Sequence, residues 1–356
     1  MQRTYRPPTL SNLKSNSWQF AGEWLTGLMI AATLASWISL TLVWQSIPIY
    51  LLPIAGGLCL AFYSSLQHEA IHGHPTCNRR FNLVLVGLPL LLWLPISHYE
   101  KNHRAHHRNE LTRPDVDPES WYVTAERWQR MSTFNRLLSV INNTFAGRMI
   151  IGPLLTAYVT FKEMVFGTPG SSRSVIDALT QNALHLIGVL LVIGWLWKIA
   201  VMPIHIYLLA FVWPATSLLL IRSFVEHRYD NNPEARTAIV EGCAAMRLLF
   251  LNNNYHVVHH RYPSLPWYRI PDVYWQLSGT SSDKQPEVSR NVVGGPWYAG
   301  YANIARRFSF SPWTSPIWPG ESLSRDAINC DAMNQTSPAT ANNEALPPAA
   351  VVSMHK

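Results

Sequence analysis

Charged residues are scarce in this sequence. Asp, Glu, Lys and Arg make up 14% of its 356 residues, whereas hydrophobic residues make up 48%. An ordinary soluble domain carries about 25% charged residues, so the composition argues against a water-soluble globule. Disorder is excluded as the main state, because disordered chains are poor in aromatic residues and this chain has 15 Trp.

Cysteine is scarce as well, and the four cysteines lie far apart without any CxxC pair. Neither a disulfide framework nor a cysteine metal site is therefore expected. The net charge of +7 does not indicate nucleic-acid binding, since that requires a basic stripe on a soluble face. A basic surplus beside apolar runs instead fits a membrane protein with positively charged cytoplasmic flanks.

Long runs without charge are what the sequence does contain. No charged residue occurs from Trp24 to Gln67, and Pro48 divides this run into two parts. Each part has about the 20 residues that a bilayer span needs. A second pair is divided by Lys198. We therefore expect two hairpins of membrane spans, because buried helices of a soluble core seldom run this long without charge; the spans are 24–44, 47–67, 178–197 and 199–221.

Two further apolar segments are too short or too interrupted to span a bilayer. Pro89 and Pro95 break the segment Phe81–Ser97, for which we expect an interfacial or re-entrant helix. We also place Met149–Phe161 in the membrane interface.

Lys and Arg border the same ends of both hairpins, so the positive-inside rule puts both termini and the large polar segments in the cytoplasm. The predicted fold class is thus an all-α integral membrane protein, with four transmembrane helices in two hairpins and a cytoplasmic helical cap. The predicted localisation is a bacterial inner membrane. The predicted organisation is a cytoplasmic segment 1–23, a membrane domain 24–320 and a disordered tail 321–356, which is rich in Ala, Asn, Pro, Ser and Thr.

Histidines occur in three clusters, each just past the cytoplasmic end of an apolar segment. The first cluster follows the HxxxH pattern and the other two follow HxxHH. On a helix this spacing brings the imidazoles to one side. A lone histidine, His227, follows the last expected span. The predicted topology gathers all of them at one membrane face; the clusters are His68-Glu-Ala-Ile-His72, His103-Arg-Ala-His106-His107 and His256-Val-Val-His259-His260.

A single HxxxH motif is more often an ordinary pair of surface or packed histidines. One HxxxH box and two HxxHH boxes on the same side of a membrane make an ordinary surface or packing role a poor explanation for all of them. Their eight histidines exceed the approximately four ligands of one zinc ion, so two metal ions are indicated. Imidazole suits iron, zinc, copper and nickel. A metal pair beside a bilayer favours iron and dioxygen, because iron changes its oxidation state and zinc does not.

The three boxes, their order and their placement relative to the hairpins resemble the membrane-bound fatty acid desaturase and hydroxylase superfamily, over roughly residues 24–275. The resemblance implies two iron ions, O2 as co-substrate and a fatty acyl substrate. It also implies a separate electron donor of the ferredoxin or cytochrome b5 type, because the His-Pro-Gly-Gly signature of a fused cytochrome b5 does not occur in this sequence. The ligands that it implies are His68, His72, His103, His106, His107, His227, His256, His259 and His260.

Several residues beside these histidines have two interpretations. Glu69 and Glu226 either orient imidazoles or are solvated or paired with arginine. Some relatives place an asparagine four residues before the lone histidine, where it holds a metal-bound water; here that position is Ser223. Asn254 is expected to cap or support the third box, and His74 to have a supporting or structural role.

Other polar residues near the boxes have a plainer expected role. Asp115, Asp117 and Glu119 lie in a run with Pro114 and Pro118 and indicate a polar loop. Trp121 is expected to be an interfacial anchor, with the lining of an acyl tunnel as the alternative. Four arginines adjoin ligand positions and are expected at lipid headgroups, or else at a substrate carboxylate: Arg104, Arg108, Arg228 and Arg261.

The boxes do not determine the product. Desaturation of a fatty acyl chain is the first expectation. Decarboxylation of a fatty acid to a terminal 1-alkene is the second, and hydroxylation of a lipid or carotenoid is the third. The alternative from another class is a non-catalytic membrane metal binder or transporter. A transporter would hold its ligands within the spans near the midplane, whereas these boxes lie beyond the span ends.

Overall fold

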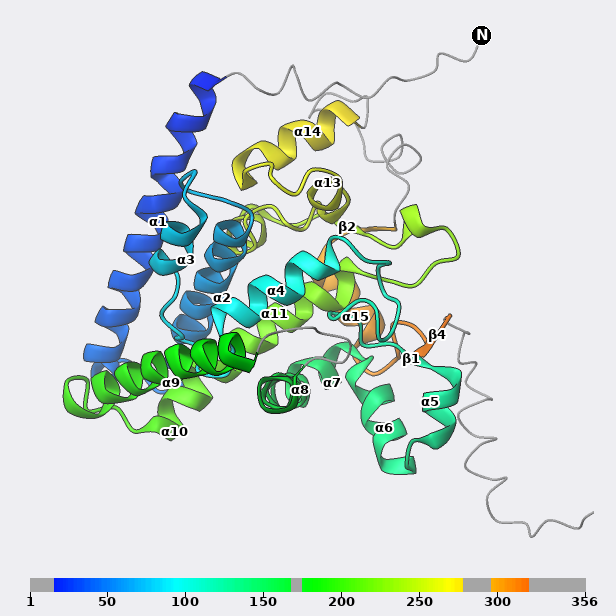
Figure 1. Ribbon diagram of the computed structural model, residues 1–356, viewed down its shortest axis with the longest axis horizontal. Coiled ribbons are helices and arrows are strands. Elements are labelled where there is room, and N and C mark those ends of the chain that lie inside the picture. Colours follow the sequence, from blue (N-terminus) through cyan, green and yellow to red (C-terminus); the bar gives the residue numbers. More distant parts are fainter. Residues whose placement is uncertain (1–15, 168–174, 278–295, 320–356) are drawn as a thin grey trace, which may run out of the picture. The chain divides into compact units, whose positions relative to one another are not determined.

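The computed structural model describes residues 16–167, 175–277 and 296–319 (Figure 1). The tail expected at 321–356 and most of the segment 1–23 lie outside these residues. The described chain is mainly helical. Its helices are α1 (Asn16–Leu42), η2 (Trp44–Ser46), α2 (Leu52–Ile71), α3 (Arg79–Leu85), α4 (Ile96–His106), α5 (Ala125–Arg130), α6 (Thr133–Asn142), α7 (Phe145–Ile150), α8 (Gly152–Phe166), α9 (Val175–Lys198), α10 (Ile204–Tyr207), the π-helical turn η3 (Leu208–Val212), α11 (Trp213–Glu226), η4 (Pro233–Ala235), α12 (Ala244–Leu249), α13 (His256–Arg261), η5 (Trp267–Arg269), α14 (Ile270–Leu277) and α15 (Tyr301–Phe308).

Extended structure is minor in the described part of the chain. Two parallel ladders of two residues each join distant segments. One pairs β1 (Val123–Thr124) with β4 (Ile317–Trp318), and the other pairs β2 (Ile239–Val240) with β3 (Trp297–Tyr298).

Three helical stretches of the described residues are long and apolar enough to cross a membrane. They are Glu23–Leu42, Ile176–Lys198 and Ile204–Glu226, close to three of the four expected spans. Only 6% of the apolar window of α9 is buried within the protein, and its large apolar side chains, such as Leu191 and Trp197, are exposed. An apolar surface of this extent requires a lipid or protein covering. These helices are those of a membrane protein.

The helix in the region of the expected span 47–67 differs from the prediction. α2 begins five residues later, with Pro53 in its first turn, and continues to Ile71. Its last turns therefore carry Gln67, His68 and Glu69, and α2 is not among the helices apolar enough to span a membrane. Most of its residues are buried, and it packs against α1 and α11. A fourth span, the hairpins and the cytoplasmic cap stay predictions.

α2 owes its central position partly to two glycines. A Cβ atom at Gly56 would lie 2.6 Å from the carbonyl oxygen of Ala210, and one at Gly57 would lie 2.8 Å from Cβ of Pro214. Real Cβ contacts essentially never come this close, so the η3–α11 backbone approaches α2 at a distance that only glycine permits. The close packing holds the histidine-bearing end of α2 beside the end of α11.

The prediction of one helix over Phe81–Ser97 is wrong in the centre of that segment. α3 ends at Leu85, and α4 begins directly after Pro95. Proline lacks the backbone N–H that a helix interior needs, and Leu92 has a φ of 64°, so Pro89 and Pro95 separate two short helices. The segment Met149–Phe161 is also divided, between α7 and α8.

Candidate metal centre

All nine histidines expected as ligands come together, although they belong to four separate parts of the chain. His68 lies in the last turn of α2, and His72 is its C-terminal cap. The second box occupies the last turn and cap of α4, and the third box occupies α13. His227 directly follows α11 and forms a β-bridge with Thr237, which holds it beside the boxes.

Four of the histidines form a first histidine group: His68, His72, His103 and His259. One ring nitrogen of each lies within 4.8 Å of the others. The Nε2 atoms of His72 and His103 are 2.9 Å apart. Nε2 of His68 is buried and has no hydrogen-bond partner.

His107 adds a fifth imidazole to the first histidine group. Its Nε2 is 3.1 Å from Nε2 of His103 and 3.0 Å from Nε2 of His259. Its ring also stacks on that of His260, with centroids 4.3 Å apart. His107 therefore lies between the first group and the remaining histidines.

The second histidine group consists of His106, His227, His256 and His260, again with one nitrogen of each within 4.8 Å of the others. Nε2 of His227 is 2.9 Å from Nε2 of His106 and 2.8 Å from Nε2 of His256. Nε2 of His260 is 3.1 Å from Nε2 of His256. The lone histidine of the sequence thus joins the second and third boxes into one cluster.

Two carboxylates fix the orientation of one imidazole in each group. Asp117 Oδ1 lies 2.7 Å from Nδ1 of His106, and Glu119 Oε1 lies 2.9 Å from Nδ1 of His103. A carboxylate accepts the Nδ1 proton, so in the neutral ring Nε2 has a free lone pair directed toward the group. Two such lone pairs at 2.9 Å repel unless a metal ion or a proton lies between them. The donor set therefore fits two metal ions.

The electrostatics favour the neutral, ligating form of most of these rings. Burial, together with the mutual repulsion of the clustered imidazoles, holds the pKa of His72, His256, His259 and His260 well below its ordinary value. Burial and the neighbouring His103 and His106 lower the pKa of His107 to about 3. Metal ligation requires the neutral imidazole, and rings with such lowered pKa values are neutral at neutral pH.

His106 behaves in the opposite way. Burial by itself lowers its pKa, but the carboxylates of Glu119 and Asp117 outweigh this effect and raise the pKa to about 9. The pKa of Glu119 is correspondingly lowered, because His106 and His103 outweigh its burial. In the absence of metal His106 therefore carries a proton at neutral pH.

The sequence indicated a polar loop at Asp117 and Glu119 and missed their contacts with the imidazoles. The loop folds back over the end of α4, and the acids lie 11 and 16 residues beyond the histidines that they contact. No periodic signal links residues at such separations through a loop. The alternation of acids with prolines directly after an HxxHH box was the one available sign.

The glutamates expected beside the ligands have different surroundings. Glu226 Oε1 is 3.1 Å from Nε of Arg222, accepts a hydrogen bond from Nδ2 of Asn253 and lies 3.6 Å from Nδ1 of His256. Glu226 therefore faces the second group while paired with arginine. Glu69 instead accepts from the backbone N–H of Trp267, away from the imidazoles of either group.

The other three expected neighbours have mainly structural contacts. Asn254 donates to the carbonyl of Val240. Ser223 donates to the carbonyl of Leu220 and lines the same cavity as His227. His74 Nδ1 lies 2.6 Å from Oε1 of Glu23, so it ties α1 to the end of the first box.

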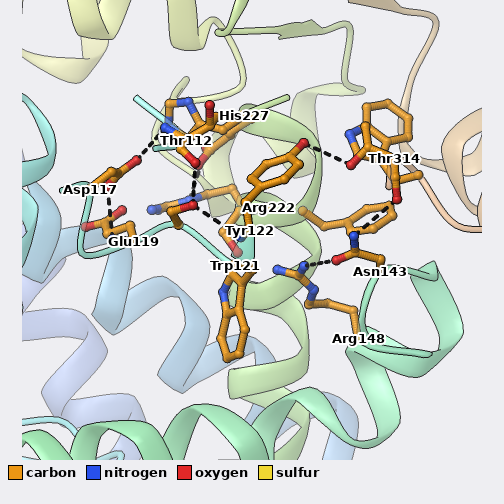
Figure 2. Close-up of a pocket in the computed structure, with 15 residues that line it drawn as sticks. Thr112, Asp117, Glu119, Trp121, Tyr122, Asn143, Arg148, Arg222, His227 and Thr314 are labelled. Atoms are coloured by element: carbon orange, nitrogen blue, oxygen red, sulfur yellow. Dashed lines mark hydrogen bonds and ion pairs between the residues drawn. The ribbon is translucent and has the colours of Figure 1, made fainter. Parts of the chain in front are cut away.

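A cavity of about 70 Å³ adjoins the second histidine group (Figure 2). His227, Asp117 and Glu119 line it, and so do Arg148 and Arg222, which sequence reasoning did not place at the site. Arg222 directly follows the last expected span, 199–221, and Arg148 lies in a short helix, α7, without a motif. Both arginines are buried.

The chain is similar to a known protein family. The profile of a family described as fatty acid desaturase matches residues 42–290, and this range contains all nine histidines. No curated protein matches the chain.

Proposed function

The chain belongs to the fatty acid desaturase family, and we propose that it oxidises a fatty acyl chain at two iron ions held by its nine clustered histidines, with O2 as co-substrate and desaturation as the reaction. The family implies an oxidoreductase with a fatty acyl substrate at a membrane. The observation that carries the proposal is the convergence of two separate histidine groups, each with its ring nitrogens within 4.8 Å of one another.

The proposed ligands divide into five and four. The first histidine group together with His107 would hold one iron, and the second histidine group would hold the other. Nine imidazoles exceed the requirement of one metal ion, since six ligands complete an octahedral site. The buried, unpartnered Nε2 of His68 and the close Nε2 pairs support this division, because a metal ion in each group would be bound by these atoms.

When bound, the irons would supply the oxidising power that removes hydrogen from an unactivated methylene group. The protein's own contribution is positioning and exclusion of water. Asp117 and Glu119 hold the Nδ1 protons of His106 and His103. The rings of His103, His106, His256 and His259 are buried, so bulk water has little access to the groups.

The remaining parts of the proposal follow from the sequence. The segment 47–67, which includes the apolar first part of α2, is the fourth membrane span, and both termini and the active site face the cytoplasm at a bacterial inner membrane. Residues 24–320 form the desaturase domain, preceded by a cytoplasmic segment and followed by a disordered tail. A separate ferredoxin or cytochrome b5 delivers the two electrons.

One observation favours a second reaction, decarboxylation of a free fatty acid to a 1-alkene. The buried cation Arg148 lines the same cavity as His227, so a carboxylate bound there would share a cavity with a member of the second histidine group. The overall reaction is R–CH2–CH2–COO⁻ + O2 + 2 e⁻ + 3 H⁺ → R–CH=CH2 + CO2 + 2 H2O. It uses the same oxidant and donor as desaturation.

A carboxyl-labelled saturated fatty acid tests the proposal. The iron-loaded protein would receive the labelled acid, an electron donor and O2, with the His106→Ala variant and an oxygen-free sample as controls. A product that retains the label and has a new double bond supports desaturation. Labelled CO2 with a chain-shortened terminal alkene supports decarboxylation. No oxidised acyl product with both irons bound contradicts both and favours carotenoid chemistry or a non-catalytic role.

A further inference from the structure

Arg148 is a buried cation at the cavity beside the second histidine group. Its exposed fraction is 4%. Nε donates to the carbonyl of Asn142, and one terminal nitrogen lies 3.5 Å from Oδ1 of Asn143. Burial lowers the pKa of Arg148 to about 10, so the guanidinium is still charged at neutral pH.

This charge has no anionic partner among the described residues. The structure contains no ion pair between Arg148 and a carboxylate of residues 23–167, 176–277 or 296–319. A buried charge is unfavourable unless it is paired. Its partners in the protein are two polar amide oxygens and the faces of the rings of Trp121 and Phe224, each with its centroid 5.3 Å from the guanidinium carbon.

The acids of the same cavity are already occupied. Asp117 and Glu119 contact the imidazoles of His106 and His103, and Glu226 pairs with Arg222. Figure 2 shows Asp117 and Glu119 at one side of the cavity and Arg148 with Asn143 at the other, with Trp121 between them. An anion at the Arg148 side is therefore separated from these carboxylates.

The cavity has the right surroundings for a carboxylate attached to an alkyl chain. Its volume of about 70 Å³ is well below the roughly 300–1,000 Å³ of pockets that enclose a whole small ligand, which suits a headgroup rather than a whole chain. Trp121, Phe224 and Trp313 line it together with the polar residues. These rings offer apolar contact to the carbons next to the headgroup.

We propose that Arg148 binds the carboxylate of a free fatty acid, which enters the cavity headgroup first. The identity of the anion as an acyl carboxylate rests on the proposed function. Guanidinium matches a carboxylate in a bidentate geometry. The arrangement selects a free acid over an ester or thioester, and it holds the headgroup in the cavity that His227 also lines.

Binding of octanoate and of its neutral analogue octanamide to the purified, iron-loaded protein in detergent tests this proposal without turnover. Isothermal titration should show wild-type protein binding octanoate more tightly than octanamide by about tenfold to a hundredfold, the range of a charge-assisted hydrogen-bonded contact. Arg148→Gln should abolish this preference, and Arg148→Lys should retain part of it.

Arg136→Gln is the matched control. Arg136 donates to the carbonyls of Trp128 and Gln129 and lies over the ring of Trp128, but it is not among the residues that line the cavity. The control should keep the full preference for octanoate. Iron content and thermal unfolding would show that each variant is folded and loaded.

A folded Arg148→Gln variant that still prefers octanoate would overturn the proposal. So would equal binding of octanoate and octanamide by the wild-type protein. The proposed function fails separately, through the absence of any oxidised acyl product. A protein that binds octanoate through Arg148 but oxidises nothing would therefore uphold the carboxylate site and contradict the proposed function.

Discussion

Replacement of Asp117 by asparagine should weaken metal binding at the second histidine group. The side chain of Asp117 is 2% exposed, and it has three donors around its two oxygens. Oδ1 accepts from Nδ1 of His106 and from the backbone N–H of Glu119, and Oδ2 accepts from the backbone N–H of Thr112. Asparagine has only one oxygen, so its amide group must face a donor on one side.

The loss can be estimated from the contact that fails. If the amide faces His106, the imidazole loses the acceptor that fixes its tautomer, and such supporting contacts typically change metal affinity by about 10–100-fold. This corresponds to about 1.4–2.7 kcal/mol. If the amide instead faces Thr112, a buried N–H loses its partner, at about 1–3 kcal/mol of protein stability.

Asp115→Asn is the control, since Asp115 lies in the same loop with its side chain 63% exposed and 3.6 Å from Arg127. Competition with a chelator of known iron affinity, followed by metal analysis, would measure the affinity of both variants and the wild type. Thermal unfolding of the metal-free proteins would detect the second outcome. If Asp117→Asn matches Asp115→Asn in both iron affinity and stability, the assigned role of Asp117 is refuted.

Three further predictions concern the ligands, the protons and the helix packing. His227→Ala should reduce iron content and activity as strongly as His106→Ala, because both rings belong to the second histidine group. His74→Ala should have a milder effect, through the loss of its contact with Glu23. Equal effects of all three substitutions would contradict the ligand assignment. Iron binding at pH 7.5 should release about one proton per chain, because the pKa of His106 is raised to about 9 without metal and ligation requires the neutral ring. This proton release should vanish above about pH 10, where His106 is already neutral. Calorimetry in buffers of different ionisation enthalpy measures the number of protons released, and a release that is independent of pH over this range would refute the assignment. Gly56→Ala should lower the free energy of unfolding in detergent by about 1–3 kcal/mol through overpacking against Ala210. Gly27→Ala, whose Cβ would meet nothing within 4 Å, should not lower it, because alanine is favoured over glycine within a helix. Equal stability of the two variants would show that α2 does not need its close contact with η3.

The proximity of the histidines within each box could be predicted because it depends on short spacings. Intervals of three and four residues place imidazoles on one side of a helical turn, and α13 and the end of α4 have this geometry. The prediction of His227 as a ligand depended on the resemblance to the family. In the structure its position beside the boxes results from the end of α11 and the bridge to Thr237.

The contacts around the imidazoles could not be predicted in the same way. Asp117 and Glu119 reach His106 and His103 through a loop, where no helical or strand period relates one residue to another. Sequence adjacency was a poor guide as well, because Glu69 adjoins His68 in the chain but accepts from the backbone of Trp267. A side chain next to a helical ligand points to another face of the helix.

The membrane segments show a similar division. α1, α9 and the stretch Ile204–Glu226 lie close to the predicted spans, because a long run without charge has few other structures available to it. α2 differs because its boundaries depend on Pro53 at its start and on the burial of its polar end against α11. Hydropathy alone indicates neither where a proline starts the helix nor which polar residues are buried against another helix.

The iron content of active, purified protein tests the central claim most directly. Metal analysis of the wild-type protein, with activity measured on the same sample, should give two irons per chain, because two separate groups of imidazoles are present. His106→Ala and His103→Ala should each reduce the content toward one. Full activity with one iron per chain, or with zinc in place of iron, would contradict the account.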